Sequence, residues 1–297
     1  MIRKGFHPIN TGGIILVLSL FSILITSCTL TQRRLPQSPW MAQIERKSGL
    51  IAYIGTDGNI YTMDQGGTNQ QQITTNAHLP NEDDPSVLLY QAPTWSPDGQ
   101  NLAFVGVSGS AGQESVEAAS LFTVSLEDLN IVETFTSDHF IPFYIYWSPA
   151  GERLGFLSNT NTGRGLALFE MPASGGEARL IDAGSPYFWS WAPDGTSIAT
   201  HAGALNQTIS MDRMSLLNLG DGGVKEQVLN LAPSEFQTPA WTPDGEHVIV
   251  AVRSGGNRVL VMLDKDGHLE RALTTFKGEI AFSVSPDGKQ VALISGD

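Results

Sequence analysis

The sequence predicts an all-β protein built from small antiparallel sheets that repeat along the chain, and three observations support this fold class. A turn motif that ends in Pro-x-Gly recurs five times. A short, almost wholly apolar run follows each motif. A second hairpin signal then precedes the next motif in four of the units. Self-similarity at a period of about 40 to 50 residues is typical of the blades of a β-propeller.

The turn motif sets the length of the repeat. Its five copies are WSPDG at 95–99, WSPAG at 147–151, WAPDG at 191–195, WTPDG at 241–245 and VSPDG at 284–288. The prolines lie 52, 44, 50 and 43 residues apart. Proline presets φ near about −65°, aspartate suits the next position, and glycine adopts the conformation that bulkier residues avoid. Each motif is therefore expected to join two strands.

The apolar runs predict strands that are covered on both faces. They occupy residues 102–105, 154–157, 198–201, 248–251 and 291–294. A continuous apolar run of this length indicates a strand between two packed layers, which is the environment inside a stack of blades. The second residue of the run is small in four of the five copies. This small residue predicts a close approach between neighbouring blades.

The second hairpin completes a four-stranded blade. Its copies lie at 121–132, 166–176, 215–223 and 259–267, and two hairpins per repeat give four antiparallel strands. Residues 50–67 supply a blade without a visible first strand, and residues 280–294 supply only two strands. We expect about six units with the last one incomplete. In one alternative, residues 280–284 complete the first blade and leave five; in another, the chain is a truncated product.

The N-terminus predicts a signal peptide over residues 1–27. Basic residues precede an apolar stretch at 14–25, whose length of about 18 Å as a helix is short of the roughly 30 Å membrane core. The sequence Ile25-Thr26-Ser27-Cys28 resembles the lipobox of bacterial lipoproteins, which implies a diacylglycerol on Cys28. The alternative is an ordinary signal peptide with an incidental cysteine. Residues 28–48 are polar, contain two prolines and predict a linker to a propeller domain over 49–297.

Composition and motifs argue against several functions. The net charge of −13 is unfavourable for a nucleic-acid partner, because phosphate binding needs a basic surface. A single cysteine permits no intramolecular disulfide and no cysteine-based zinc site. The sequence has no Gly-x-Ser-x-Gly motif and no paired histidines at metalloprotease spacing. We therefore predict no catalytic residues, no cofactor and no metal.

Aromatic residues supply the candidate binding site. The predicted lining consists of Tyr144, Tyr146, Tyr187, Trp189 and His201. The four aromatic residues lie on the approaches to two first strands, and His201 stands where the other repeats carry an apolar residue. A buried, hydrogen-bonded histidine is the alternative for His201. The four motif tryptophans, at 95, 147, 191 and 241, are instead expected to pack between blades.

The repeat also resembles a known family. The Ser-Pro-Asp-Gly turns, the strand Ile60–Asp64 and the Gly-Gly turns are similar to the WD-like repeat of TolB-like β-propellers and of the propellers of prolyl-oligopeptidase-type enzymes. The resemblance covers roughly residues 49–297 and implies the propeller fold, but no particular activity. Together with the lipobox-like N-terminus and the absence of catalytic motifs, it leads us to predict a non-catalytic, lipid-anchored propeller of the bacterial cell envelope, outside the cytoplasm, that binds a protein or peptide partner. The alternative is an enzyme, or the gating propeller of a hydrolase whose catalytic domain is missing.

Overall fold

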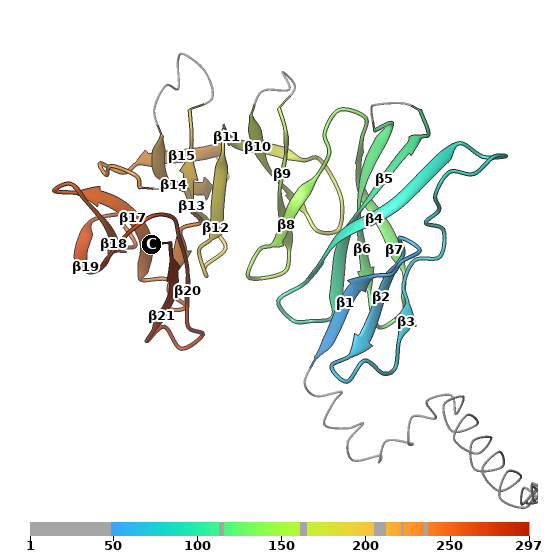
Figure 1. The fold of residues 1–297 in the computed structure, drawn as a ribbon, viewed down its shortest axis with the longest axis horizontal. Coiled ribbons are helices and arrows are strands. Elements are labelled where there is room, and N and C mark those ends of the chain that lie inside the picture. The colour runs from blue at the N-terminus through green and yellow to red at the C-terminus, as the bar shows by residue number, and fades with distance from the viewer. Residues whose placement is uncertain are drawn as a thin grey trace, which may run out of the picture. The chain divides into compact units, whose positions relative to one another are not determined.

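The computed structural model of the chain describes residues 49–112, 116–160, 165–204, 212–220, 223–234 and 237–296. The predicted signal peptide, Cys28 and the linker lie outside these residues. The described residues form β-strands joined by turns and loops, and the strands group into six antiparallel sheets (Figure 1). None of the described residues belongs to a helix of the length and apolar character needed to cross a membrane.

The sheets follow one another in chain order. Sheet 1 contains β1 (Leu50–Ile54), β2 (Ile60–Asp64) and β3 (Gln71–Gln72). Sheet 2 contains β4 (Ser86–Trp95), β5 (Asn101–Ser110), β6 (Ala118–Ser125) and β7 (Ile131–Ser137). Sheet 3 contains β8 (Phe143–Trp147), β9 (Arg153–Asn159), β10 (Leu166–Pro172) and β11 (Arg179–Gly184).

The remaining sheets repeat this arrangement. Sheet 4 contains β12 (Tyr187–Trp191), β13 (Ser197–Ala202), β14 (Arg213–Gly220) and β15 (Gly223–Val228). Sheet 5 contains β16 (Ala240–Trp241), β17 (His247–Ser254), β18 (Asn257–Asp264) and β19 (Leu269–Phe276). Sheet 6 contains β20 (Ile280–Val284) and β21 (Val291–Ser295).

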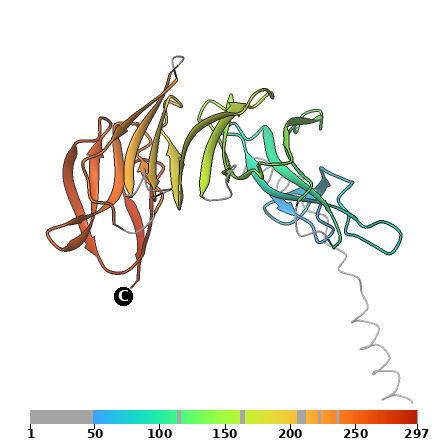
Figure 2. The ribbon, with the colours of Figure 1, turned by 90° about the horizontal axis from the view of Figure 1, so that it is seen from above.

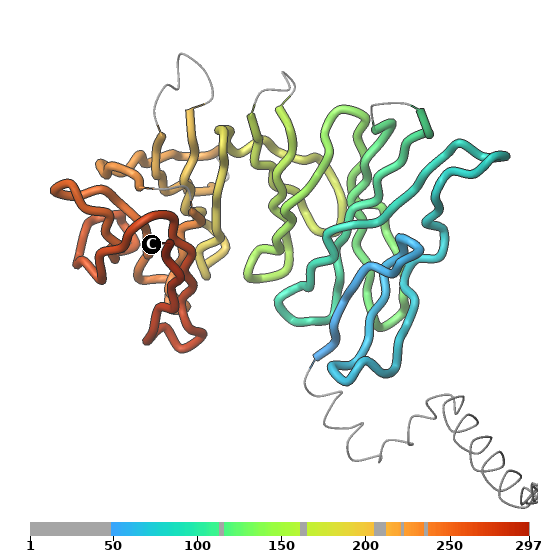
Figure 3. Tube along the Cα trace, viewed as in Figure 1, coloured from blue at the N-terminus to red at the C-terminus, as the bar shows by residue number. Residues whose placement is uncertain are grey.

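Each sheet is an up-and-down meander, in which consecutive strands are hydrogen-bonded neighbours (Figure 3). The predicted all-β repeat of four-stranded blades is confirmed, with three strands in sheet 1 and two in sheet 6. Strand β20 pairs with β21 from Ile280↔Ser295 to Val284↔Val291. The described structure therefore has six units, and β20 does not complete sheet 1.

The Pro-x-Gly motifs form the predicted turns. In the first, the N–H of Gly99 donates to the carbonyl of Ser96 over 2.9 Å, and Gly99 has a φ of +69°. The carboxylate of Asp98 accepts hydrogen bonds from the Ser96 hydroxyl and from the N–H of Gln100. The glycines of the other four motifs also have φ between +67° and +74°, which is the left-handed region that only glycine enters without strain. Glycine is therefore required at this point of every repeat.

Successive turns also stack on one another. A Cβ built on Gly151 would lie 3.7 Å from Cδ of Pro97 in the preceding motif. The same contact joins Gly195 to Pro149 at 3.6 Å, Gly245 to Pro193 at 3.7 Å and Gly288 to Pro243 at 3.3 Å. The rigid proline ring of one sheet thus supports the turn of the next sheet at every step from sheet 2 to sheet 6.

The hydrophobic core lies between sheets. Five clusters of buried side chains each join two consecutive sheets, from sheets 1 and 2 to sheets 5 and 6. Figure 2 shows the succession of these sheets in the ribbon. In β17, Val248 and Val250 face the cluster shared with sheet 4, whereas Ile249 and Ala251 face the cluster shared with sheet 6. Since alternate residues of a strand point to opposite faces, this second strand must be apolar throughout. The prediction that these runs are covered on both faces is confirmed.

The motif tryptophans pack between sheets, as predicted. Trp95, Trp147, Trp191 and Trp241 each contact the cluster between their own sheet and the preceding one. The prediction of a close approach at the small second residue is confirmed at Gly155, which lies against the indole of Trp189 in sheet 4.

Candidate functional site

The first strands of the four-stranded sheets and of sheet 6 form an uncharged part of an acidic protein. These strands are β4, β8, β12, β16 and β20, and none of them contains Asp, Glu, Lys, Arg or His. Strand β4 contacts β8, and β16 contacts both β12 and β20. The whole chain carries a net charge of −13, so its charged groups lie on other strands and on the connections. We call these five elements the first-strand face.

Two tyrosines project from this face. Tyr144 and Tyr146 of β8 are 48% and 46% exposed, and their ring centroids lie 5.5 Å apart. The ring of Tyr146 also meets the indole of Trp189 in β12, with centroids 5.6 Å apart and planes at 89°. Trp189 in turn lies 5.9 Å from Trp191. These four rings form a continuous aromatic row that passes from sheet 3 to sheet 4.

The backbone explains why Tyr144 projects. It has a φ of +54° and lies at a bulge, where the pairing of β8 with β9 shifts between Phe143 and Tyr146. Ala92 occupies the corresponding bulge of β4, three residues before the motif tryptophan, with a φ of +53°. The bulge thus recurs in two sheets, while the tyrosine side chain is particular to sheet 3. A non-glycine residue at this φ is strained, and such strain tends to occur at functional sites.

The tyrosine hydroxyls add hydrogen-bonding capacity to the exposed rings. Burial raises the pKa of Tyr146 above its ordinary value of 10.0, and the neighbouring Tyr144 raises it further. The hydroxyl of Tyr146 is therefore protonated at neutral pH and can donate a hydrogen bond. A flat apolar ring with a polar tip is the combination most often found in protein-binding surfaces.

The other three predicted site residues are buried. Trp189 lies directly behind Tyr146, whereas Tyr187 and His201 belong to the packed interior of sheet 4. The hydroxyl of Tyr187 donates to Oδ2 of Asp182 over 2.9 Å. Burial lowers the pKa of His201, against opposing effects of Asp212 and of the backbone of Gln237. Of the five predicted lining residues, Tyr144 and Tyr146 are thus exposed, Trp189 packs against Tyr146, and Tyr187 and His201 lie in the interior of sheet 4.

A partly buried ionic network links sheets 3 and 4, and sequence reasoning missed it. Nη2 of Arg213 in β14 lies 2.6 Å from both carboxylate oxygens of Asp182 in β11. Its Nε donates to Glu226 in β15 over 2.8 Å. Burial raises the pKa of Asp182, although the charge of Arg213 acts in the opposite direction. The three residues are far apart in the sequence and follow no motif, so only the stacking of the sheets could reveal the network.

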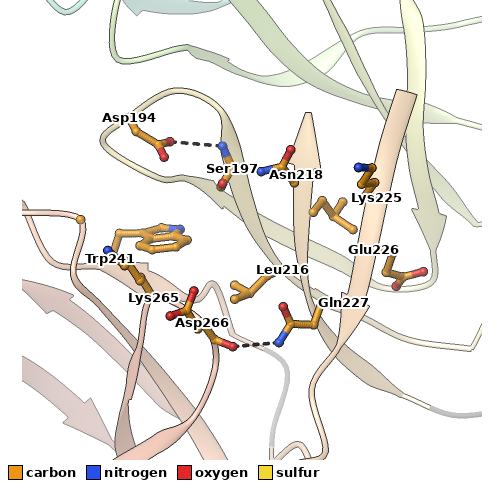
Figure 4. Close-up of a pocket in the computed structure, with 12 residues that line it drawn as sticks. Asp194, Ser197, Leu216, Asn218, Lys225, Glu226, Gln227, Trp241, Lys265 and Asp266 are labelled. Carbon is orange, nitrogen blue, oxygen red and sulfur yellow. Dashed lines mark hydrogen bonds between the residues drawn. The ribbon is translucent and has the colours of Figure 1, made fainter. Parts of the chain in front are cut away.

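A polar groove of about 300 Å³ lies between sheets 4 and 5 (Figure 4). Its lining includes Trp241 and charged side chains of both signs. Gln227 donates to the backbone carbonyl of Asp266 over 2.8 Å, and Lys265 lies 3.4 Å from Glu246. Several of its polar groups are thus paired with one another. In the part of the chain that the structure describes, no group of three or more His, Cys, Asp or Glu side chains could hold a metal ion.

The fold and the first-strand face define a protein of the β-propeller class: small four-stranded meanders stack through their faces, and their first strands lie side by side. The family model described as the TolB beta propeller domain matches residues 85–286. That match covers more than half of the chain, and the chain belongs to this family. A second model, of the T cell CD4 receptor C terminal region, matches only residues 11–47 and shows no family membership.

Three relatives are similar to parts of the chain. A protein of Agrobacterium fabrum, named only as uncharacterized, is 26% identical over 219 residues, which span 70% of this chain and 67% of that protein. The Tol-Pal system protein TolB of Francisella tularensis is 34% identical over 74 residues, 25% of this chain and 17% of its own length. The peptidase YuxL of Bacillus subtilis, also named as uncharacterized, is 28% identical over 222 residues, 70% of this chain and 30% of its own.

Solved structures share the fold. Dipeptidyl peptidase 4 of Porphyromonas gingivalis superposes with a TM-score of 0.59 at 12% identity, covering 82% of this chain and 40% of that one. Prolyl oligopeptidase B of Galerina marginata gives a TM-score of 0.53 at 12% identity, over 82% of this chain and 36% of that one. At these identities the likeness shows the propeller fold alone.

Proposed function

We propose that this propeller is non-catalytic and binds an extended, uncharged segment of a protein partner across the aromatic row. The observation that carries the proposal is the exposed pair Tyr144 and Tyr146, which projects from a face without charged residues. Tyrosine rings supply a large contact area at a small cost in side-chain entropy, and their hydroxyls pair with peptide groups. Trp189 holds the ring of Tyr146 from behind and so preorganises the surface.

The absence of charged residues from the first-strand face favours a ligand segment that is itself uncharged. A charged side chain that docked there would lose water and would gain no counter-charge from these strands. An uncharged segment has no such cost, and its apolar groups pack on the rings. The rest of the chain is acidic and disfavours acidic partners at longer range. The ligand is thus expected to be neutral where it touches Tyr144 and Tyr146, and neutral or basic beyond them.

We further propose that the protein is held on a membrane, outside the cytoplasm, in the bacterial cell envelope. In this proposal residues 1–27 are removed as a signal peptide, Cys28 carries the lipid, residues 28–48 are the linker, and residues 49–297 form the propeller. The support is the order of basic residues, apolar stretch and lipobox-like Ile25–Cys28. Two or more acyl chains give stable membrane attachment, whereas one alone is reversible.

Site-specific photo-crosslinking tests the proposed binding surface. A photoreactive phenylalanine analogue is placed at position 144 of the full chain in its native envelope, and at exposed Leu180 of β11 as a matched control. We expect a discrete adduct from position 144, its loss on adding Tyr146→Ala, and no such adduct from position 180. The same adduct from both positions, or none from position 144, would refute the site.

A second candidate function is favoured by one comparison. The Bacillus subtilis peptidase aligns over 222 residues, and those residues span 70% of this chain. In this alternative the propeller controls access to a hydrolase domain. The intact mass of the natural protein distinguishes the two functions. A polypeptide longer than one ending at Asp297, with hydrolase activity, would favour the gating propeller, while a mass that ends at Asp297 favours the stand-alone binding protein.

A further inference from the structure

A second groove, between sheets 5 and 6, has a chemistry that the first-strand face does not share. It has a volume of about 310 Å³. Its apolar lining comes from β17, β18, β19, β20 and β21 and consists of Ile249, Leu260, Met262, Leu273, Val284, Val291 and Leu293. Threonines 242 and 274 are the uncharged polar residues of the wall. We call it the sheet 5–6 groove.

The groove between sheets 4 and 5 provides an internal comparison, because the same parts of the repeat line both. Each groove is lined by the first residue of a turn motif, by its glycine, and by the third and fourth strands of the preceding sheet. The first residue is Trp241 in the polar groove and Val284 in the sheet 5–6 groove. Valine is much smaller than the tryptophan of the other four motifs. The two grooves have almost the same volume, about 300 and 310 Å³, so the substitution changes the wall of the groove from an indole to an aliphatic side chain and does not enlarge the groove.

Two cations lie at this otherwise apolar groove. Arg271 and Lys289 both line it. Among the described residues, Arg271 forms no ion pair, and its guanidinium meets only Sδ of Met262 at 3.9 Å. Nζ of Lys289 reaches the carboxylate of Asp287 only at 4.0 Å. In a chain with 30 acidic and 17 basic side chains, two weakly paired cations beside an apolar wall form a distinctive combination.

We propose that the sheet 5–6 groove binds a single-chain fatty acid. Its aliphatic chain lies on the accessible part of the wall, formed by Met262, Leu273 and Leu293, and its carboxylate lies between Arg271 and Lys289. Burial of methylene groups drives the binding, and the two cations supply charge-assisted hydrogen bonds to the head. The proposal does not depend on the peptide-binding proposal, because the aromatic row lies on β8 and β12, whereas strands β17 to β21 line this groove.

Calorimetric titration of the full chain with dodecanoate, below its critical micelle concentration, tests this site. We expect saturable binding of one molecule per chain. The variant Val284→Trp restores the side chain present in the other four motifs, and it should weaken binding by at least about tenfold because a bulky indole replaces the aliphatic wall on which the chain lies. The double variant R271Q/K289Q should weaken binding by at least about fivefold by removing the two cations. Lys265→Gln, in the polar groove, is the control and should leave affinity within about twofold.

The head group provides an independent readout. Dodecyltrimethylammonium has the same chain and a positive charge, so wild-type protein should bind it at least about tenfold more weakly than dodecanoate. The absence of saturable dodecanoate binding would overturn the proposal, as would equal binding of the two amphiphiles. Unchanged affinity in both V284W and R271Q/K289Q would also overturn it. If V284W fails to fold, the cation variant and the head-group comparison still decide.

Discussion

Gly155 of β9 lies so close to Trp189 of β12 that a Cβ at position 155 would come within 2.5 Å of Cη2 of the indole. This contact joins two sheets and also fixes the tryptophan that supports Tyr146. A methyl group at 155 would force the indole to shift, and the aromatic row would shift with it. The packing between sheets and the exposed surface are therefore coupled through one glycine.

Gly155→Ala is expected to destabilise the protein by about 1–3 kcal/mol, because overpacking a well-filled core displaces side chains. Urea denaturation measures the loss. The same variant should weaken crosslinking from position 144. Gly220→Ala is the control, since a Cβ at Gly220 meets only Oδ1 of Asn218, at 3.8 Å. Its effect should stay within about 0.5 kcal/mol. Equal stability of the two variants would contradict the close contact.

The buried carboxylate of Glu170 provides a second prediction. It binds Arg153 at 2.9 Å and Arg179 at 2.8 Å. Arg153 also donates to the carbonyl of Gly195 in sheet 4 and lies over the ring of Trp191, 5.6 Å from its centroid. Glu170→Gln removes the charge that orients Arg153, and we expect a loss of about 1–3 kcal/mol in the free energy of unfolding.

Arg179→Gln is the matched control for Glu170→Gln. It removes only one of the two ion pairs, and the side chain of Arg179 is partly exposed. Such pairs contribute little, so a loss below about 1 kcal/mol is expected. If R179Q destabilises as much as E170Q, the link through Arg153 to sheet 4 has no energetic role.

The aspartates of the turn motifs are expected to make the stability of the fold depend on pH in the acidic range. Hydrogen bonds from the hydroxyls of Ser96, Thr242 and Ser285 hold the pKa values of Asp98, Asp244 and Asp287 below the ordinary 3.8. At any pH between the pKa values of these aspartates in the folded and in the unfolded chain, the unfolded chain binds more protons than the folded one. The stabilisation by these hydrogen-bonded carboxylates is therefore complete above pH 3.8. It is lost as the pH falls through the lower pKa values that the aspartates have in the folded chain.

The triple variant D98N/D244N/D287N tests this effect. Asparagine keeps the hydrogen-bond acceptor and removes the titrating group. The midpoint of thermal unfolding should fall less steeply below pH 3.8 in the variant than in the wild type. Measurements at pH 7 provide the reference. Parallel curves for the two proteins would show that the turns do not contribute to acid sensitivity.

The proposed lipid anchor makes a prediction about mass. Protein extracted from native membranes should have the mass of residues 28–297 plus diacylglycerol or more. Cys28→Ala should abolish the modification and leave the signal peptide uncleaved or the protein unanchored. Thr31→Ala, in the proposed linker, should be modified as in the wild type. An unmodified, soluble wild-type protein would contradict the anchor and leave the propeller assignment unaffected.

The repeat could be predicted from the sequence because its determinants are local. Each Pro-x-Gly turn needs a proline and a left-handed glycine within five residues, and each second strand must be apolar on both faces. These requirements recur along the chain, so the order of the sheets follows from the spacing of the motifs. The tryptophans could be placed between sheets for the same reason.

The exposure of individual aromatic residues could not be predicted in this way. Tyr146 and Tyr187 both lie on first strands, yet one is exposed and the other is buried against Asp182. The difference depends on what the neighbouring sheet places opposite each side chain. No motif encodes that arrangement, because the two partners come from different repeats.

The sequence by itself determined the fold class, the positions of the turns and the apolar runs that follow them, since these depend on residues close together in the chain. Only the tertiary structure decided which side chains reach the surface, which charges meet across sheets and where space is left unfilled. Val284 illustrates the division: the sequence shows valine in place of tryptophan, but only the stacking of sheets 5 and 6 places that aliphatic side chain in the wall of a groove that Arg271 and Lys289 also line. Contacts between distant residues depend on shape complementarity, which the folded chain alone establishes.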